Sequence, residues 1–581
     1  MPRLTDPKLS PGNHLLAEGR AMARDWRVGR CTFLDSEQVR SEAEYKRREA
    51  ARGRIMQHAH IGFRKVDRTV AAMAELHQAA DRSGVKIDRF GITLDWAMGY
   101  PPDLRDQATR GTGIVLSGPE DFARITNASP AAAHFGDFML GLPGAVENTC
   151  GALAAGATAI GNLGQYFTFR LPGWDDDVAT TEATVKALGL IAAQDMDILV
   201  HSNLDDGFAG LFLDMVSALG MVLIEKHIVE DLIGAHASFC FGHHFSAPLS
   251  RMAFQAAVAR VTDTPGSMIF GNTVSYRGEA AANYASLSSY LLADIAALGR
   301  HHSGHAINPV PVTENLRIPE TSEILDAQLF AARLAEHEAG YADLFDVTAI
   351  DLLTDQLCVG CETFKTRALA GLADRGVDTT DPAALMLAIR RLGSRRMEFL
   401  FGAGEDVRNH RQPLVPADWA RELDHMAEDW LAHQTIEPED LTGVRVALGT
   451  TDVHEHGAHL VRDVMQRIGV EVIDAGVAVD ADDLVTTALE ANADVIAVST
   501  YNGVGLSYAR SVKTELEKRN ADLPVIIGGK LNGIPEQSNS DLPVDVSDDI
   551  AKTGAIPCAD LDAMVPVLRD CATRKRSAGT G

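Results

Sequence analysis

The chain has 581 residues, of which 46% are hydrophobic and 23% charged, and its formal net charge is −27. This length predicts at least two domains, and the strongly acidic balance argues against a nucleic acid or an anionic membrane as partner, because either needs a basic face. No apolar run reaches the roughly 18 residues of a membrane helix, no secretory signal is visible, and the seven cysteines are sparse. We therefore expect a cytoplasmic protein.

Residues 1–84 are predicted to form a helical extension ahead of the first domain. Residues 40–56 are charged and helix-forming, and residues 66–82 have the spacing of an amphipathic helix. We expect these helices to serve packing or self-association. A homodimer through this extension or through the adjoining domain is the expected oligomer.

Residues 85–401 alternate short apolar or β-branched runs with helical stretches. Strands are predicted at 87–94, 113–116, 158–160, 197–200, 221–225, 238–241 and 267–270, and helices at 178–193, 208–219, 250–261, 324–338, 352–372 and 382–401. This alternation predicts an α/β fold whose parallel sheet has right-handed crossovers. Its length suits a closed (β/α)8 TIM-like barrel, and a doubly wound sheet is the alternative that periodicity leaves open.

Polar residues gather directly after several of these strands. The candidates are Asn162, Gln165, His201, Asn203, His243 and His244. In a barrel such positions lie at the C-terminal mouth, where active sites form. Loops are polar in general, but successive loops rich in Asn and His predict a hydrogen-bonding mouth that binds a small-molecule substrate.

A second α/β unit is predicted at 441–572, after a linker at 402–440 that contains three prolines and an acidic helix. Its predicted strands are 444–448, 471–474, 495–499 and 524–527, with helices at 457–468, 481–491 and 507–518. This order predicts a Rossmann-like or flavodoxin-like domain with binding loops at the carboxyl ends of the strands.

Three of these loops carry the chemical signal. The first contains Asp452, His454 and Gly457 in the pattern D-x-H-x-x-G, in which the Asp can orient a metal-binding His and the Gly allows close backbone approach. On its own, the pattern is equally typical of a helix that begins with Asp452 as its N-cap. The other two loops supply Ser499, Tyr501, Gly503 and Gly505, and then Gly528 and Gly529. Neither GxGxxG nor a P-loop motif is present, so a dinucleotide or a nucleoside triphosphate is not expected.

The three motifs, in this order, resemble the cobalamin-binding domain of B12-dependent mutases and methionine synthase. The resemblance implies that His454 is the lower ligand of cobalt and that Asp452 orients its ring. It also implies that the serine loop, including Gly503 and Gly505, and the Gly-Gly loop hold the nucleotide tail of cobalamin between them. The sequence departs from the family's S-x-L pattern at Tyr501, which is expected to alter the lining of that slot.

Longer stretches resemble the glutamate mutase family: VSTYNGVG and IGGKLNG in the second unit and, more weakly, HSNLDDG, GHHFSAP and ENLRIP upstream. This resemblance implies an adenosylcobalamin-dependent carbon-skeleton mutase, with barrel and cobalamin-binding subunits fused in one chain and Glu314 at the adenosyl ribose. Where the family has arginines and a glutamate for its substrate, this sequence has Asn162 and an apolar residue near Leu140. We therefore expect a small amino acid or carboxylic acid other than glutamate.

Two other functions remain open from the sequence. A corrinoid methyltransferase shares the small domain but carries a helical cap before the histidine motif, for which residues 402–440 are short. A cobalamin-dependent sensor needs an output module, and no basic DNA-binding face is visible.

Overall fold

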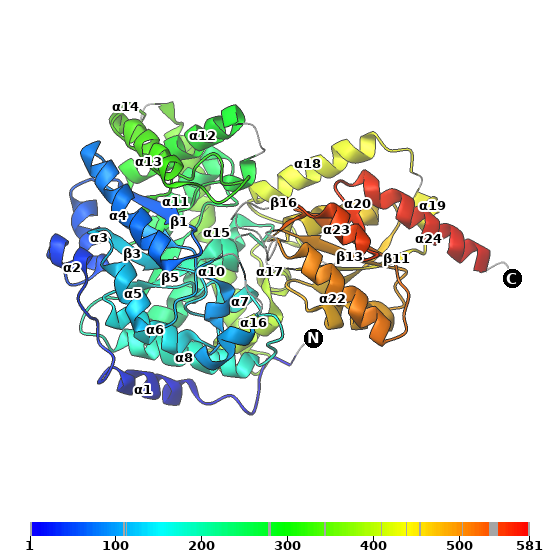
Figure 1. The fold of residues 1–581 in the computed structure, drawn as a ribbon, viewed down its shortest axis with the longest axis horizontal. Helices are drawn as coiled ribbons and strands as arrows, with labels where there is room; N and C mark the ends of the chain where they lie inside the picture. The colour runs from blue at the N-terminus through cyan, green and yellow to red at the C-terminus, as the bar shows by residue number, and fades with distance from the viewer. Residues whose placement is uncertain are drawn as a thin grey trace. The chain divides into compact units, whose positions relative to one another are not determined.

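The computed structural model describes residues 3–108, 111, 113–208, 210–276, 280–341, 344–407, 410–436, 438–451, 455–501, 503–533 and 544–578. The chain divides into two compact units, Met1–Leu171 with Asp175–Asp418, and Trp419–Gly581 with Pro172–Trp174. The first unit is coloured blue to yellow-green and the second yellow to red (Figure 1). Within the described residues, no helix combines the length and the apolar character that crossing a membrane requires.

The N-terminal unit is built on a parallel sheet whose strand order is β6-β5-β4-β3-β2-β1-β8-β7. The strands are β1 (Met56–Ile61), β2 (Arg89–Ile92), β3 (Ala132–Phe135), β4 (Ala159–Ile160), β5 (Leu199–Asn203), β6 (His236–Cys240), β7 (Met268–Ile269) and β8 (Ala306–Ile307). A parallel bridge from Phe241 to Ile269 joins the two ends of this order and closes the sheet. The predicted (β/α)8 barrel is confirmed, and the doubly wound alternative is wrong.

A helix follows each strand, as the barrel fold requires. These helices are α4 (Val66–Arg82), α5 (Pro119–Thr126), α6 (Ala145–Ala154), α8 (Asp177–Ala192), α10 (Met215–Lys226), α11 (Pro248–Val261), α12 (Ala280–Arg300) and α13 (Thr321–Ala335). Further helices are α1 (Gly12–Met22), α2 (Thr32–Glu37), α3 (Glu42–Ala51), α7 (Gln165–Thr168), α9 (Leu204–Gly207), α14 (Glu338–Tyr341), α15 (Val347–Ala373), α16 (Pro382–Leu392) and α17 (Ser394–Phe401).

Two of the predicted strands are not strands of the barrel. Residues 221–225 belong to α10, which is buried from Met215 to Glu225 and packs against α15. A helix enclosed on all sides shows a continuous apolar run, which periodicity does not separate from a buried strand. Residues 113–116 contribute a single bridge, between Leu94 and Ile114.

The predicted boundary at residue 84 is also wrong, because the first strand–helix repeat of the barrel, β1 and α4, lies before it. Helix α3 precedes β1 and buries Lys46 completely. The Lys46 ammonium donates hydrogen bonds to the carbonyl oxygens of Gly266 (2.9 Å), Ser267 (2.9 Å) and Gly304 (2.8 Å), just before β7 and β8. Helix α3 therefore closes the N-terminal end of the barrel.

The C-terminal unit has a parallel sheet in the order β12-β11-β13-β14-β17. Its strands are β11 (Arg445–Thr450), β12 (Glu471–Gly476), β13 (Val495–Thr500), β14 (Val525–Gly529) and β17 (Ile556–Cys558), and its helices are α20 (His456–Arg467), α21 (Ala481–Glu490), α22 (Gly505–Lys518), α23 (Ser547–Lys552) and α24 (Val565–Ala578). Apolar side chains form one core on each face of the sheet. This is the flavodoxin-like order, so the predicted fold is confirmed, although β17 was not predicted.

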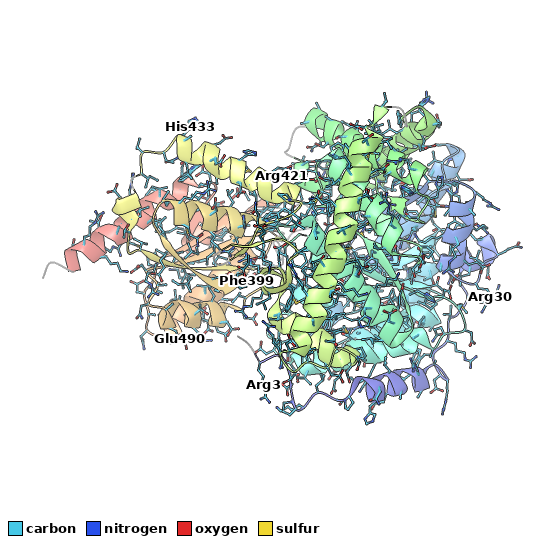
Figure 2. The ribbon with its side chains drawn as sticks, turned by 180° about the vertical axis from the view of Figure 1, so that it is seen from behind. Arg3, Arg30, Phe399, Arg421, His433 and Glu490 are labelled. Carbon is cyan, nitrogen blue, oxygen red and sulfur yellow. The ribbon has the colours of Figure 1, made fainter. Side chains whose placement is uncertain are left out.

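The predicted linker at 402–440 contains the boundary between the units, at Asp418–Trp419. It holds a short hairpin of β9 (Asp406–Val407) and β10 (His410–Arg411), then α18 (Asp418–Ala432) and α19 (Pro438–Leu441). Helix α18, with the labelled Arg421 in its first turn and the labelled His433 directly after its end (Figure 2), packs Ala427 and Trp430 into one core of the C-terminal sheet. Most of this helix is therefore part of the second domain.

Candidate functional site

The carboxyl ends of neighbouring strands bring the motifs of the C-terminal unit together. Ser499 pairs in register with Thr450 of β11 on one side and with Gly528 of β14 on the other. A Cβ placed on Gly457 would lie 2.9 Å from Ser499 Oγ, so the glycine faces the serine directly. Asp452 and His454, the predicted cobalt-binding pair, lie outside the described residues.

A cavity of about 530 Å³ opens at these loops. Four motif residues line it: Gly457, Ser499, Gly528 and Gly529. The other lining residues are Met426, Asp429, Trp430, Leu448, Leu460, Val461, Ala497, Val498, Ile526, Cys558, Ala559, Asp560, Leu561, Asp562 and Met564. Its walls are thus largely apolar, with acidic groups at three positions, which is typical of a site that buries a flat, mostly uncharged group.

Helix α18 forms one wall of this cavity, which sequence reasoning did not find. Trp430 Nε1 and Gln434 Nε2 each donate a hydrogen bond of 2.9 Å to Asp562 Oδ1, and Trp430 and Asp562 both line the cavity. At the start of the same helix, the ring of Trp419 lies 4.7 Å from that of His456, the first residue of α20. Helix α18 is therefore fixed against the loops that follow β11 and β17.

The remaining residues of the serine loop shape its backbone and do not line the cavity. Gly503 has φ of +79°, and a Cβ on Gly505, the first residue of α22, would lie 3.1 Å from Thr500 Cγ2. Tyr501, which stands where the family has Leu, is 43% exposed, and Lys530 Nζ lies 5.2 Å from its ring centroid. Tyr501 is not among the residues that line the cavity.

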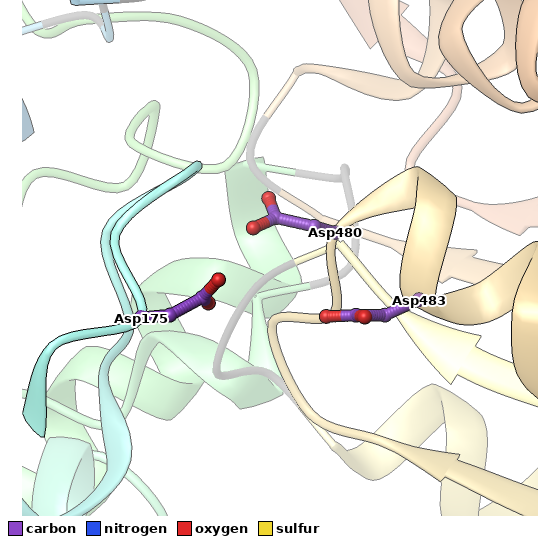
Figure 3. A group of neighbouring side chains, drawn as sticks. All are labelled: Asp175, Asp480 and Asp483. Carbon is purple, nitrogen blue, oxygen red and sulfur yellow. The ribbon is translucent and has the colours of Figure 1, made fainter.

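The start of α21 carries several acidic side chains, of which Figure 3 labels Asp480, immediately before the helix, and Asp483, in its first turn. Negative charge at a helix N-terminus is stabilised by the helix dipole, which accounts for both. Asp175, drawn in the same figure, belongs to the barrel unit.

The mouth of the barrel holds a network centred on Asn162, which follows β4. Asn162 Oδ1 accepts hydrogen bonds from the backbone N–H groups of Gly164 (2.9 Å) and Asn203 (2.8 Å). Asp206 Oδ2 accepts from Asn162 Nδ2 (3.2 Å) and from Asn203 Nδ2 (2.8 Å). The structure thus brings these two predicted residues together, and Asp206 is a member of the network that the prediction omitted.

Gln165 and the two histidines lie at the same end of the barrel, after β4 and β6. Gln165 Oε1 accepts from the Phe138 N–H at 2.8 Å, and its Nε2 lies 3.5 Å from Asp137 Oδ1. Burial raises the pKa of Asp137. The mouth therefore combines amides with a buried carboxyl group whose pKa is raised.

His243 and His244 pack against each other, with ring centroids 4.8 Å apart. The backbone N–H of His243 donates a hydrogen bond to Asp205 Oδ2 at 2.8 Å, and Thr273 Oγ1 lies 3.1 Å from the ring nitrogen Nδ1 of His243. His244 Nδ1 lies 3.6 Å from Asp205 Oδ1. Burial raises the pKa of Asp205, and the neighbouring His243 opposes that shift.

His201 differs from the other candidates, because it lies inside the barrel. Its Nδ1 is 2.8 Å from Ser267 Oγ, and its ring is 4.4 Å from that of His134 on β3. His58 and His60 on β1 continue this row of rings. In the sequence Gln-His-Ala-His, these two histidines occupy alternate positions, which is the spacing of a strand. The stretch lies inside the segment predicted to be a helical extension.

Glu314 and the arginines of the barrel unit lie in different environments. Glu314 is exposed in the segment that follows β8, on the mouth side of the barrel. Arg317 is engaged by Glu323 through contacts of 2.6 and 2.7 Å, and Arg170 is exposed. Arg277 lies outside the described residues. Among the described residues, the arginine inside the barrel is Arg89 of β2, which is 1% exposed.

Comparison with known proteins shows that part of the chain is similar to cobalamin-related proteins. Residues 443–547 match the B12 binding domain family. A segment of 93 residues is 34% identical to the 2-hydroxyisobutanoyl-CoA mutase small subunit of Aquincola tertiaricarbonis, and it covers 16% of this chain and 68% of that subunit. A novel cobalamin-binding protein from Desulfitobacterium hafniense DCB-2, of known crystal structure, is 23% identical with a TM-score of 0.18. That match covers 22% of this chain and 58% of the other, less than two thirds of its length.

The family match at 443–547 includes strands β11 to β14 and the positions Gly457, Ser499, Gly528 and Gly529 that line the cavity. Through this domain, the chain belongs to the family of B12-binding proteins that includes the small subunits of B12-dependent mutases.

Proposed function

We propose that the protein is an adenosylcobalamin-dependent mutase that rearranges the carbon skeleton of a small amino acid or carboxylic acid other than glutamate. The observation that carries the proposal is the apolar cavity of about 530 Å³ bounded by Gly457, Ser499 and Gly528-Gly529. The family match accounts for cobalamin binding, and the relative in Aquincola tertiaricarbonis is itself a mutase subunit. The closed barrel supplies an enclosed site for the substrate.

The residues around the cavity fit the nucleotide tail of cobalamin. Three of the four motif residues that line the cavity are glycines, which leave room for a bulky group. The fourth, Ser499, offers a hydroxyl group. In the proposal His454 binds cobalt and Asp452 orients its ring. The cofactor, when bound, supplies the radical that removes a hydrogen atom from the substrate.

The barrel residues have binding and positioning roles in this proposal. Asn162 and Asn203 are held by backbone N–H groups and by Asp206, so their orientations are set before a substrate arrives. Glu314 is assigned to the adenosyl ribose. Helix α3 closes the far end of the barrel, which keeps water from entering there. The protein is proposed to act in the cytoplasm, as a homodimer.

A corrinoid methyltransferase is less consistent with this chain. The segment from residue 402 to β11 contains, among its described residues, the short hairpin of β9 and β10 and the helices α18 and α19. Helix α18 is committed to the core of the C-terminal domain, which leaves little for a separate helical cap.

Reconstitution with adenosylcobalamin tests the proposal. We expect tight binding with the base-off, His-on absorption spectrum, which His454→Ala abolishes. Ser499→Leu should weaken binding by about a hundredfold, because it fills the cavity, whereas Ser507→Leu on the exposed face of α22 should not. Exchange of tritium from 5′-labelled cofactor into a panel of acids would then identify the substrate. If methylcobalamin turns over with a methyl acceptor while adenosylcobalamin does not bind, the mutase assignment is wrong.

A further inference from the structure

Four histidine rings form a continuous row inside the barrel. Their centroids are separated by 5.9 Å from His60 to His58, 5.9 Å from His58 to His134 and 4.4 Å from His134 to His201. His58 is fully buried, and His134 and His201 are each 2% exposed. His60, which is partly exposed, is the residue of the row nearest the carboxyl end of β1.

Several polar atoms of this row have no hydrogen-bond partner among the described residues. They are His58 Nε2, His60 Nδ1, both ring nitrogens of His134 and Nη2 of the neighbouring Arg89. A buried polar atom without a partner costs about 1–3 kcal/mol, and natural proteins contain few of them. So many buried polar atoms without partners in one place indicate that this region binds a polar ligand.

The hydrogen bonds of Arg89 and His58 show which of their remaining nitrogens are donors. Arg89 can only donate, so its Nη1, 3.4 Å from His58 Nδ1, makes that nitrogen an acceptor and leaves the ring proton on Nε2. Arg89 Nε lies 2.6 Å from Glu42 Oε1, and Nη1 also donates to the Ser267 carbonyl oxygen at 3.1 Å. Of the atoms without a partner, Arg89 Nη2 and His58 Nε2 are therefore both donors.

Two glycines make room for these nitrogens. Gly91 lies two residues after Arg89 on β2 and shares its face of the strand. A Cβ on Gly91 would lie 2.5 Å from His58 Nε2 and 2.7 Å from His60 Nδ1. A Cβ on Gly136 would lie 2.9 Å from His134 Nε2. A side chain at either position would displace the ring nitrogens.

We propose that this row is the floor of the substrate pocket, and that Arg89 Nη2, His58 Nε2 and His134 bind one carboxylate of a small acid. The assignment rests on the proposed function, since it names the class of substrate that the barrel accepts. A carboxylate offers only acceptors and so matches the donors Arg89 Nη2 and His58 Nε2 and the single N–H of a neutral His134 ring. Burial and the nearby Arg89 lower the pKa of His58 and His134, so Arg89 supplies the positive charge.

The test measures binding to the full-length protein by titration calorimetry, with butyrate as probe and butyramide as its neutral isostere. We expect butyrate to bind at least about tenfold more tightly than butyramide, with or without adenosylcobalamin. His134→Phe and Arg89→Met should each weaken butyrate binding by about tenfold or more. His305→Phe, at a buried histidine that contacts Ser303 outside the row, is the matched control and should leave it unchanged.

Equal affinity for the acid and the amide, or no binding of either, would overturn the inference, and this comparison in the wild-type protein needs no variant to fold. Unchanged butyrate binding in a folded His134→Phe protein would overturn it as well. The outcome is separable from that of the proposed function. If butyrate binds but adenosylcobalamin does not, the mutase assignment fails and the carboxylate site stands. If adenosylcobalamin binds but butyrate does not, only the site fails.

Discussion

A buried carboxyl group behind the barrel mouth should make the stability of the N-terminal unit depend on pH. Glu225 on α10 is 1% exposed and accepts a hydrogen bond from Ser202 Oγ. Ser202 lies between His201 and Asn203 on β5, so this contact also fixes the strand that carries two candidate residues. Burial raises the pKa of Glu225 from 4.5 to about 7, and the serine hydroxyl opposes the shift.

The sign of the effect follows from proton uptake. Between pH 4.5 and pH 7 the folded protein holds a proton on Glu225 that the unfolded chain has released, so the free energy of unfolding falls as the pH rises. A shift of roughly 2.5 pKa units corresponds to about 3 kcal/mol. For a unit of roughly 400 residues, with an unfolding entropy near 2.1 cal/mol/K per residue, this is about 3–4 °C in Tm.

Calorimetry of wild type and Glu225→Gln at pH 5 and pH 8 measures this contribution. The glutamine keeps an acceptor for Ser202 but does not titrate, so Tm of the variant should fall about 3 °C less than that of wild type between the two pH values. Glu362→Gln, at an exposed glutamate on α15, should behave as wild type. Identical pH dependence in wild type and Glu225→Gln would refute the reasoning.

Four further substitutions test other parts of the structure. Gly529→Ala should lower Tm of the C-terminal unit by the equivalent of more than about 2 kcal/mol, because φ is +104° and the new Cβ would lie 2.2 Å from the Thr500 carbonyl oxygen. Gly443→Ala, with φ of +90° but nothing within 4 Å, should cost only the backbone strain, about 1 kcal/mol by calorimetry. Lys46→Met leaves three carbonyl oxygens without their donor and should destabilise the barrel by about 3 kcal/mol in thermal unfolding. Trp430→Leu should weaken adenosylcobalamin binding about tenfold in a spectroscopic titration, since it removes part of one cavity wall.

The fold was predictable where a strand or helix shows its own period. Helix α4 lies at 66–82 as predicted, and the four predicted strands of the C-terminal domain all form. Two of the strands that were not predicted are very short: β8 of the barrel has two residues and β17 of the C-terminal sheet has three. Neither is long enough to show a period. The helix α10 was misread in part because its surroundings leave it no polar face.

The candidate site was predictable only where its residues lie in recognisable loops. Ser499 and the Gly-Gly pair line one cavity as the resemblance implied. The wall formed by Trp430 depends on Asp562, 132 residues away, and no local pattern announces such a contact. The histidine row was missed for a related reason, since its members come from different strands and meet only when the barrel closes.

The closure of the barrel by α3 has a consequence for how the chain is made. Lys46 leaves the ribosome before its carbonyl partner at Gly304, which lies 258 residues further along the chain. At synthesis rates of about 5–20 residues per second, the helix waits roughly 10–50 seconds for that partner. During this interval a lysine and a glutamate destined for complete burial remain in water, where both are well solvated. Helix α3 is thus synthesised before the strands of the barrel, but its contact with Gly304 forms only after that residue has been made.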